Sequence, residues 1–443
     1  MATVQVDLSK NCGAVKPMHA VNNGPVYKFA VDQRITNIDS YRAAGIPFAR
    51  THDASFCSTY GGEHTVDIRA IFPDFDADPY DPASYDFVLT DEYLKVIEFA
   101  GAKVFYRLGN KIEHWKKKYG TLPPKDFRKW AVICEHIIRH YTEGWADGFH
   151  MDIEYWEIWN EPDLDADDSP HKRCWGGTKA QFFELYDVAA RHLKACFPHL
   201  KIGGPAIAGH LDWAEDFLSQ LKAPLDFFSW HIYANVPEKV AARAEKVRAL
   251  LDKYGFAQTE SILNEWNYVR GWTGDDWLYS LRMEKSLKGA AFIAATMSVC
   301  QSIPMDMLMY YDARPCGMNG MFSTDFICDC LKGYYPFRMF NELYKLGTAV
   351  QVQAGEGVYA CAARGEGKAA VMLTHYNDDD AAQAQEVRLE LRGLQGRVRA
   401  KYYLLDAKHD MKLVREEVFA AGECAAYLNM DNLSTVLVEL EAI

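Results

Sequence analysis

The sequence predicts an α/β protein that consists of a (β/α)₈ barrel, the TIM-barrel fold, and an accessory antiparallel β-sandwich domain. Up to about residue 345, short apolar runs alternate with amphipathic helical segments, as strands and helices do in a parallel barrel. After residue 346 apolar and polar residues alternate strictly, as in Val387–Leu391, which is typical of half-buried antiparallel strands. The pattern of apolar and polar residues therefore changes once, at the expected boundary between the two domains.

Eight apolar runs are the predicted barrel strands: 17–22, 47–52, 103–108, 155–159, 200–203, 226–233, 261–265 and 306–311. The most regular helix is predicted over residues 125–142, because Trp130, Ile133, Ile137 and Tyr141 recur at spacings of three and four. A second helix begins after Thr178, which with Gln181 matches a capping box.

Three segments are expected along the chain. Residues 13–345 form the catalytic barrel and residues 346–443 the C-terminal β-sandwich. Residues 1–12 contain a short alternating stretch, Thr3–Leu8, so we expect an N-terminal strand that joins the β-sandwich.

Composition narrows the function classes. The chain has 443 residues, of which 49% are hydrophobic and 25% charged, as in ordinary globular proteins. A net charge of −13 without a basic stripe argues against nucleic acid or an anionic membrane as partner, and favours neutral ligands. The start of the chain lacks the pattern of a signal peptide, so we expect a cytoplasmic protein.

No cofactor or metal is expected. The 11 cysteines include no Cys-x-x-Cys pair and are interpreted as reduced thiols, and the chain contains no glycine-rich phosphate-binding pattern. The sequence leaves the oligomeric state open, a homo-oligomer included.

Two glutamates lie in matching settings at predicted strand ends. Glu161, in Trp159-Asn160-Glu161-Pro162, follows the fourth strand, and Glu265, in Asn264-Glu265-Trp266, ends the seventh. Active sites of these barrels lie at the C-terminal ends of the strands, so both side chains should reach one mouth. A pair of carboxyl groups is what glycoside hydrolysis requires, one as general acid and one as base or nucleophile. The alternative is that both are ion-paired residues at the barrel rim.

The segment Leu122–Leu164, which includes Tyr155-Trp156-Glu157-Ile158-Trp159-Asn160-Glu161-Pro162, resembles glycoside hydrolase family 39, a family of retaining barrel enzymes. Further segments match in the correct order: Arg50-Thr51-His52, Ile202–Ala206, Phe227–Tyr233 and Asn264–Asn267. The resemblance implies that Glu161 is the acid/base, that Glu265 is the nucleophile, and that configuration at the sugar is retained.

Neighbouring residues have expected roles. Asn160 is placed to bind the sugar 2-hydroxyl, and Arg50 to keep Glu265 ionised and oriented. The other substrate-binding candidates lie on strand ends: His52, Asp53, His231, Tyr233, Trp266 and Tyr310, with Tyr311 as the alternative to Tyr310. Each of them also has an ordinary packing interpretation.

Departures from the family pattern bear on the substrate. Asp53 stands where many relatives have glycine, and Asn264 replaces the usual threonine before the nucleophile. A carboxylate at position 53 would accept from sugar hydroxyls and narrow the pocket. Arg314 and Lys111 are cations that could meet a uronate, but Asp53 and the net charge argue against an acidic sugar.

The expected activity is that of a retaining exo-glycosidase that releases a terminal neutral pentose, such as a β-xyloside, from oligosaccharides. Loops at 53–88 and 267–279 would wall off the pocket with their aromatic residues, Phe56, Tyr60, Phe72, Phe75, Trp272 and Trp277. The alternatives are an α-L-arabinofuranosidase, an iduronidase-like enzyme or an endo-glycanase on the same scaffold, and a non-catalytic carbohydrate-binding protein.

Overall fold

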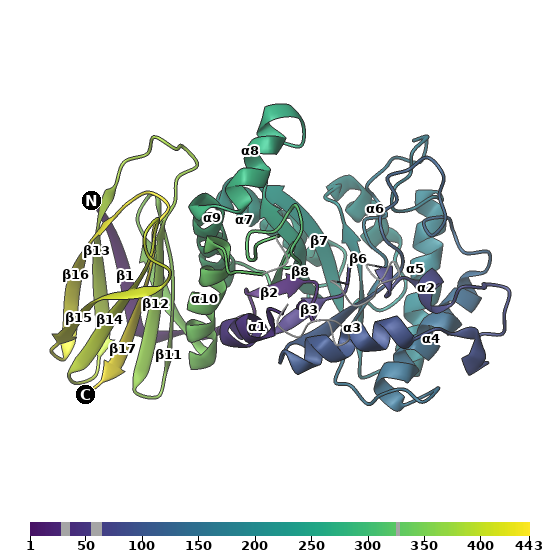
Figure 1. Ribbon diagram of the computed structural model, residues 1–443, viewed down its shortest axis with the longest axis horizontal. Coiled ribbons are helices and arrows are strands. Elements are labelled where there is room, and N and C mark those ends of the chain that lie inside the picture. The colour runs from purple at the N-terminus through teal and green to yellow at the C-terminus, as the bar shows by residue number, and fades with distance from the viewer. Residues whose placement is uncertain (28–35, 55–63, 325–327) are drawn as a thin grey trace.

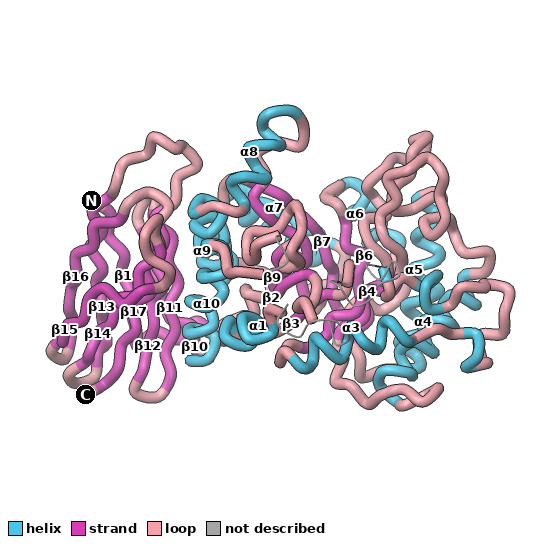
Figure 2. Tube along the Cα trace, viewed as in Figure 1, coloured by secondary structure: helices cyan, strands magenta, loops and turns pink. Residues whose placement is uncertain are grey.

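The computed structural model describes residues 1–27, 36–54, 64–324 and 328–443, which form a barrel and a separate sheet (Figures 1 and 2). Eight strands close the barrel in sequence order, and all neighbouring pairs are parallel. Their bounds are β2 Ala20–Asn22, β3 Phe48–Arg50, β4 Lys103–Leu108, β5 Tyr155–Ile158, β6 Lys201–Ile207, β7 Phe227–Ala234, β8 Glu260–Tyr268 and β9 Met307–Tyr310. The predicted fold class is confirmed, and each predicted barrel strand overlaps an observed one.

Helices cover the outside of the barrel (Figure 2). Their bounds are α1 Ile38–Ala44, α2 Ile68–Ile71, α3 Val88–Phe99, α4 Phe127–Glu143, α5 Lys179–Cys196, α6 Leu211–Gln220, α7 Pro237–Lys253, α8 Gly274–Glu284, α9 Leu287–Ser302 and α10 Tyr335–Leu346, with two 3₁₀ turns, η2 Pro82–Ser84 and η3 Lys332–Tyr334. Local sequence explains where they begin. The side chain of Asp126 accepts from two backbone amides at the start of α4, and Thr178 and Gln181 form the predicted capping box of α5.

The smaller sheet has nine strands in the order β15-β14-β17-β12-β11-β10-β1-β13-β16. Their bounds are β1 Ala2–Ala14, β10 Thr348–Ala354, β11 Val358–Gly365, β12 Lys368–His375, β13 Gln385–Leu394, β14 Val398–Leu405, β15 Lys412–Phe419, β16 Gly422–Met430 and β17 Thr435–Ala442. One detail differs from an antiparallel sheet. The N-terminal strand β1 runs antiparallel to β10 but parallel to β13, because it fills the place between them.

Strand β1 shows why this segment belongs to the smaller sheet. Val4 and Val6 are fully buried in the apolar core of the sheet, whereas Thr3 and Gln5, which alternate with them, are half-buried. Helices α9 and α10 lie between this sheet and the barrel (Figure 1). An ion pair crosses the same boundary, since the ammonium group of Lys288 on α9 reaches the carboxylate of Asp378.

The inside of the barrel is layered. An apolar plug fills it below the mouth, with side chains from six strands: Ala20, Phe105, Tyr155, Phe227, Ile262, Met307 and Met309. Two residues further along β4, β5 and β7, the inward positions hold Arg107, Glu157 and Ser229 instead. A polar layer therefore lies between the plug and the mouth, and the site is built on it.

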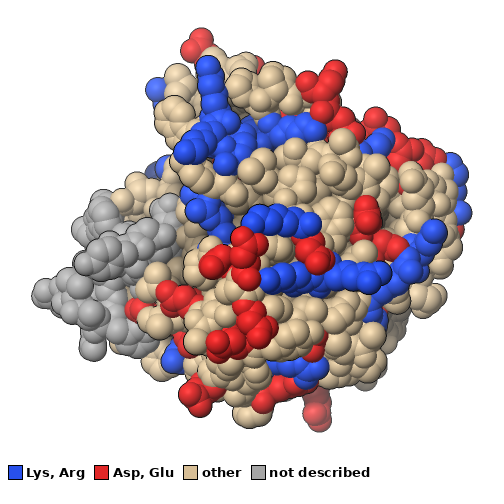
Figure 3. All heavy atoms as spheres, turned by 90° about the vertical axis from the view of Figure 1, so that its right-hand side faces the viewer, with Lys and Arg blue, Asp and Glu red and all other residues tan. Residues whose placement is uncertain are grey.

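The outer surface carries charges of both signs. On the end of the barrel farthest from the smaller sheet, blue and red side chains are interspersed (Figure 3). Among the described residues, no helix is both long and apolar enough to span a lipid bilayer.

Candidate active site

The mouth of the barrel contains a cavity with a volume of about 740 Å³. Eight residues singled out from the sequence line it: His52, Asn160, Glu161, His231, Tyr233, Glu265, Trp272 and Tyr311. These side chains come from the ends of barrel strands and from the loops that follow them, which lie far apart in the sequence, and the barrel brings them to one place.

Beneath this cavity, Arg50 is a fully buried cation that joins four strands. Its guanidinium donates to Glu157 at 2.7 Å, to the side-chain oxygen of Asn22 at 2.9 Å and to that of Asn160 at 2.6 Å. It also lies 3.5 Å from a carboxylate oxygen of Glu265. Removing one partner of such a buried pair leaves an uncompensated charge, which costs about 3–5 kcal/mol. Arg50 therefore fixes the position of the site, and loss of Arg50 alone would destabilise the barrel.

The position of Glu265 depends on a β-bulge in β8. His231 of β7 pairs with Glu265, while the preceding residue of β7 pairs with Leu263, so Asn264 is the extra residue. Asn264 donates its side-chain amide to buried Glu157. Because a bulge shifts the alternation by one residue, Glu265 faces the mouth directly after inward-facing Asn264.

Glu161 reaches the mouth through a left-handed turn after β5. Trp159 has a φ of 74° and Glu161 a φ of 48°, conformations that are costly for residues other than glycine and that are common at functional sites. The indole of Trp159 packs outward against Trp130 and Trp175 and donates to the carbonyl of Cys174. The turn thus directs the indole away from the barrel axis and the carboxyl group toward the cavity.

The two carboxyl groups meet at His231. Its Nδ1 lies 2.8 Å from an oxygen of Glu161 and 3.6 Å from an oxygen of Glu265, and these three atoms lie within 4.8 Å of one another. The thiol of Cys174 donates to the second oxygen of Glu161 over 3.8 Å, and the Tyr233 hydroxyl donates to Glu265 at 2.5 Å.

The surroundings of the two carboxyl groups differ. Burial raises the pKa of Glu161 to about 7, so this group still carries a proton near neutral pH. Burial also raises the pKa of Glu265, together with the charge of Glu161, but His231, Arg50 and the Tyr233 hydroxyl oppose the shift. Burial lowers the pKa of His231, which favours the neutral ring. Burial therefore raises the pKa of both carboxyl groups, and Glu265 has in addition a cation and a hydroxyl donor that favour its charged form.

Asn160 and His52 both line the cavity, as expected from the sequence. Because the side-chain oxygen of Asn160 accepts from Arg50, its amide N–H groups are what it can offer to a sugar hydroxyl. Burial lowers the pKa of His52 to about 4, so its ring lines the cavity in the neutral form at neutral pH.

Two expectations are corrected. Trp266 and Tyr310 are fully buried and do not line the cavity; Trp266 packs against Tyr310 and Phe292 on the helix side of the barrel. The bulge before Glu265 explains Trp266, because it exchanges the inward and outward positions. Tyr311, one residue beyond Tyr310 and on the opposite face, lines the cavity instead.

Asp53 is directed into the protein and is not among the residues that line the cavity. Its carboxylate lies 3.4 Å from the guanidinium of Arg314, 3.1 Å from the ring of His52 and 3.2 Å from that of His64. These contacts keep the pKa of Asp53 well below its usual value against the effect of burial. Asp53 thus orients His52, and Arg314 is already paired with a carboxylate.

Sequence reasoning missed some residues of the site. Glu157, in the middle of buried strand β5, anchors both Arg50 and Asn264, and a charge within a predicted buried strand could have indicated it. Trp272, in contrast, was expected to wall the pocket, and the structure agrees. It lines the cavity and packs edge-on against Tyr233 at 4.9 Å. Phe56 and Tyr60 lie outside the described residues.

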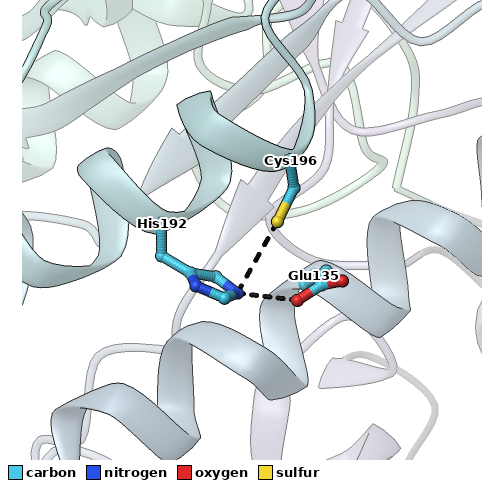
Figure 4. A group of neighbouring side chains, drawn as sticks. All are labelled: Glu135, His192 and Cys196. Carbon is cyan, nitrogen blue, oxygen red and sulfur yellow. Dashed lines mark hydrogen bonds and ion pairs between the residues drawn. The ribbon is translucent and has the colours of Figure 1, made fainter.

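A separate cluster lies between helices α4 and α5, away from the mouth (Figure 4). The ring of His192 lies 2.7 Å from Glu135, and the thiol of Cys196 lies 3.9 Å from the same ring nitrogen. Arg139 donates to the other oxygen of Glu135 at 2.8 Å. The cluster joins the two helices through the hydrogen bond between His192 and Glu135.

Comparison with known proteins agrees with this geometry. The model of glycosyl hydrolases family 39 matches residues 55–302. The chain belongs to this family. The matching model describes glycosyl hydrolases, enzymes that cleave glycosidic bonds in carbohydrates.

The chain is 29% identical over 230 residues to one relative, a β-xylosidase of Geobacillus stearothermophilus. That match spans 45% of this chain and 43% of the relative, so the chain matches less than half of the relative's length. A glucosidase structure from Croceicoccus marinus aligns with 100% of this chain and 99% of its own, with a TM-score of 0.80 and 24% identity. A monomeric β-xylosidase from Caulobacter crescentus aligns over 100% and 99% of the two chains, with a TM-score of 0.73 and 18% identity. Both structures share the fold of this chain.

The raised pKa of Glu161 predicts a pH-dependent effect of Glu161→Gln on stability. A carboxyl group with a folded-state pKa of about 7 and a model value of 4.5 lowers the free energy of unfolding as pH rises between these values. Glutamine removes this cost. We therefore expect Glu161→Gln to be more stable than the wild type by about 1–3 kcal/mol at pH 8, with a smaller difference at pH 5.

Denaturant unfolding at the two pH values measures this difference. Glu184→Gln, on the exposed face of α5, is the matched control and should change stability equally little at both. An equal effect of Glu161→Gln at pH 5 and pH 8 would contradict the assignment of a buried, proton-holding carboxyl group.

Proposed function

We propose that this family 39 glycosidase is a retaining exo-enzyme that releases a terminal pentose by double displacement, with β-xylosides as the first candidates. The observation that carries the proposal is the approach of Glu161 and Glu265 around His231, within 4.8 Å. Carboxyl groups about 5–5.5 Å apart are typical of retaining enzymes, whereas about 6.5–9.5 Å is typical of inverting ones, which need room for water.

In the first step, the carboxyl group of Glu161 transfers its proton to the glycosidic oxygen. The bond between that oxygen and C1 breaks, and a carboxylate oxygen of Glu265 forms a bond to C1 from the opposite face. The leaving group departs as a neutral alcohol. Tyr233 and Arg50 hold Glu265 in place for this attack.

In the second step, the carboxylate of Glu161 takes a proton from water while the water oxygen attacks C1. The ester bond to Glu265 breaks, its carboxylate is regenerated, and Glu161 again carries the proton. Two inversions at C1 give net retention. Asn160 contributes through its amide, since a hydrogen bond to the sugar 2-hydroxyl strengthens as positive charge develops at the ring.

The choice of a terminal pentose rests on two supports. The curated relative with 29% identity is named a β-xylosidase. In addition, Trp272 lies beside Tyr233 at the cavity and stacks on Trp277, with 5.2 Å between the ring centroids. Aromatic rings therefore border the opening. Such rings can pack on the apolar face of a sugar and close one end of a cleft.

Substitution of the two glutamates should separate their roles. Glu265→Ala removes the attacking carboxylate, so we expect a loss of more than about 10³-fold in kcat, and azide should restore turnover with a glycosyl azide of inverted configuration. Glu161→Ala should lose about 10²–10⁴-fold on substrates with poor leaving groups, and azide should give the retained azide. Product analysis by NMR distinguishes the two.

Glu356→Ala, in a turn of the smaller sheet, is the control and should keep wild-type activity. Identical azide products from the two active-site variants, or wild-type activity in Glu265→Ala, would exclude this assignment of roles, whereas no turnover by the wild type on any glycoside would favour a protein that only binds sugar.

A panel of 4-nitrophenyl pentosides and hexosides, together with polymeric xylan, tests the substrate and the mode of action. We expect release of 4-nitrophenol from a pentoside, β-xyloside above all, and only monosaccharide from oligosaccharides. Preference for an α-L-arabinofuranoside or an iduronide would replace the sugar but not the mechanism. Internal cleavage of xylan without release from any aryl glycoside would contradict exo action.

A further inference from the structure

The charges that line the active-site cavity are unlike those of the whole chain. The sequence contains 61 acidic and 48 basic residues. Among the described residues that line the cavity, however, the acidic side chains are the two catalytic glutamates, whereas Arg173 and Arg243 are both cationic. The rings of His114 and His210 line the same cavity. Outside the catalytic pair, the charged side chains that line the cavity are therefore the two arginines.

Arg243 differs from the other arginines around the site because it has no carboxylate partner among the described residues. It lies on α7, half-buried, and donates one hydrogen bond to the carbonyl oxygen of Gly209. Arg173 is in contrast held by Asp165 through two of its nitrogens, at 2.8 and 3.1 Å. Burial lowers the pKa of Arg243, as expected for a cation that lacks a compensating anion.

The nearby carboxylate of Asp163 does not fill this role. It is buried and accepts the backbone N–H groups of Ala208, Gly209 and His210 at 2.7, 3.2 and 3.0 Å. Asp163 thus shapes the loop after β6, which places the Gly209 carbonyl under Arg243 and the ring of His210 at the cavity. Within the described part of the chain, that ring makes no hydrogen bond that would compete with a ligand.

These basic side chains belong to the acid side of the cleft. Arg173 lies in the loop after β5, as Glu161 does, and its charge lowers the pKa of Glu161. Arg243 lies on the helix after β7, but its side chain donates to Gly209 in the loop after β6. His210 comes from the same loop, whose backbone is bound by Asp163, two residues after Glu161. Because Glu161 gives its proton to the leaving-group oxygen, the leaving group must lie on the side of Glu161.

We propose that Arg243, together with His210, binds a carboxylate on the leaving group, so that the preferred substrates carry an acidic residue such as a uronic acid directly after the released sugar. A guanidinium can bind a carboxylate with two parallel hydrogen bonds, which gives both affinity and orientation. The inference rests on the proposed function, because it assumes that Glu161 protonates the leaving group. The released sugar itself stays neutral.

A matched pair of substrates tests this preference. The two carry the sugar that the wild type releases fastest, one on 3-carboxy-4-nitrophenol and the other on 3-carbamoyl-4-nitrophenol, which has nearly the same shape without the charge. For each protein, the ratio of kcat/KM for the carboxylate substrate to kcat/KM for the carbamoyl substrate is measured. We expect this ratio to be about tenfold or more higher in the wild type than in Arg243→Gln. This preference should shrink as salt rises from about 0.05 to about 0.5 M.

Lys246→Gln is the matched control, since it removes one positive charge from the exposed face of the same helix. It should keep the wild-type ratio, and Arg243→Lys should keep part of it. Equal ratios in the wild type and in Arg243→Gln, while both hydrolyse the neutral substrate, would overturn the inference and leave the proposed function intact.

Equilibrium binding provides a test that does not depend on turnover. By calorimetry, D-glucuronate should bind the wild type and bind Arg243→Gln at least about fivefold more weakly, whereas D-xylose should bind both proteins equally. No detectable binding of D-glucuronate to the wild type, or equal binding to both proteins, overturns the inference even if no glycoside is hydrolysed.

Discussion

The buried guanidinium of Arg50 is the interaction on which the rest of the active site depends. It has no contact with solvent, and its hydrogen bonds reach residues at the ends of β2 and β5 and the carboxylate in the middle of β5. A buried cation requires anions and oxygens around it, so the barrel must place polar side chains at this depth. Glu157 satisfies this need from below, and Glu265 and Asn160 approach from above. The same cation thus holds Glu265, the proposed nucleophile, and leaves the amide N–H groups of Asn160 available to a ligand.

A second constraint is that both catalytic strands break the regular alternation of side chains. The bulge at Asn264 allows two consecutive residues of β8 to face inward, and the left-handed turn from Trp159 to Glu161 turns the indole outward and the carboxyl group inward. Each break costs local stability and is held by its surroundings: Asn264 by Glu157, and Trp159 by the aromatic residues of α4 and α5. Both carboxyl groups of the site are therefore placed where the regular strand structure is interrupted.

Much of the fold could be predicted because it follows local patterns: eight apolar runs, a capping box, and the change to strict alternation. The paired Asn-Glu settings likewise predicted the two glutamates at one mouth. The orientation of Trp266 could not be predicted, since the bulge that turns it outward depends on the pairing of β8 with β7. Net charge could not predict the charges that line the cavity, because Arg173 lies in the loop after β5 and Arg243 on helix α7 after β7. Only the barrel brings them together.

Trapping the covalent intermediate tests the central claim most directly. An activated 2-deoxy-2-fluoro analogue of the preferred pentoside lacks the 2-hydroxyl and slows the second step, so the glycosyl-enzyme should accumulate. Mass spectrometry of the intact protein and of its peptic peptides should show one fluoropentosyl group per chain, attached to Glu265. A label on Glu161 or on any other residue, or hydrolysis of the natural substrate to a product of inverted configuration, would contradict the double displacement.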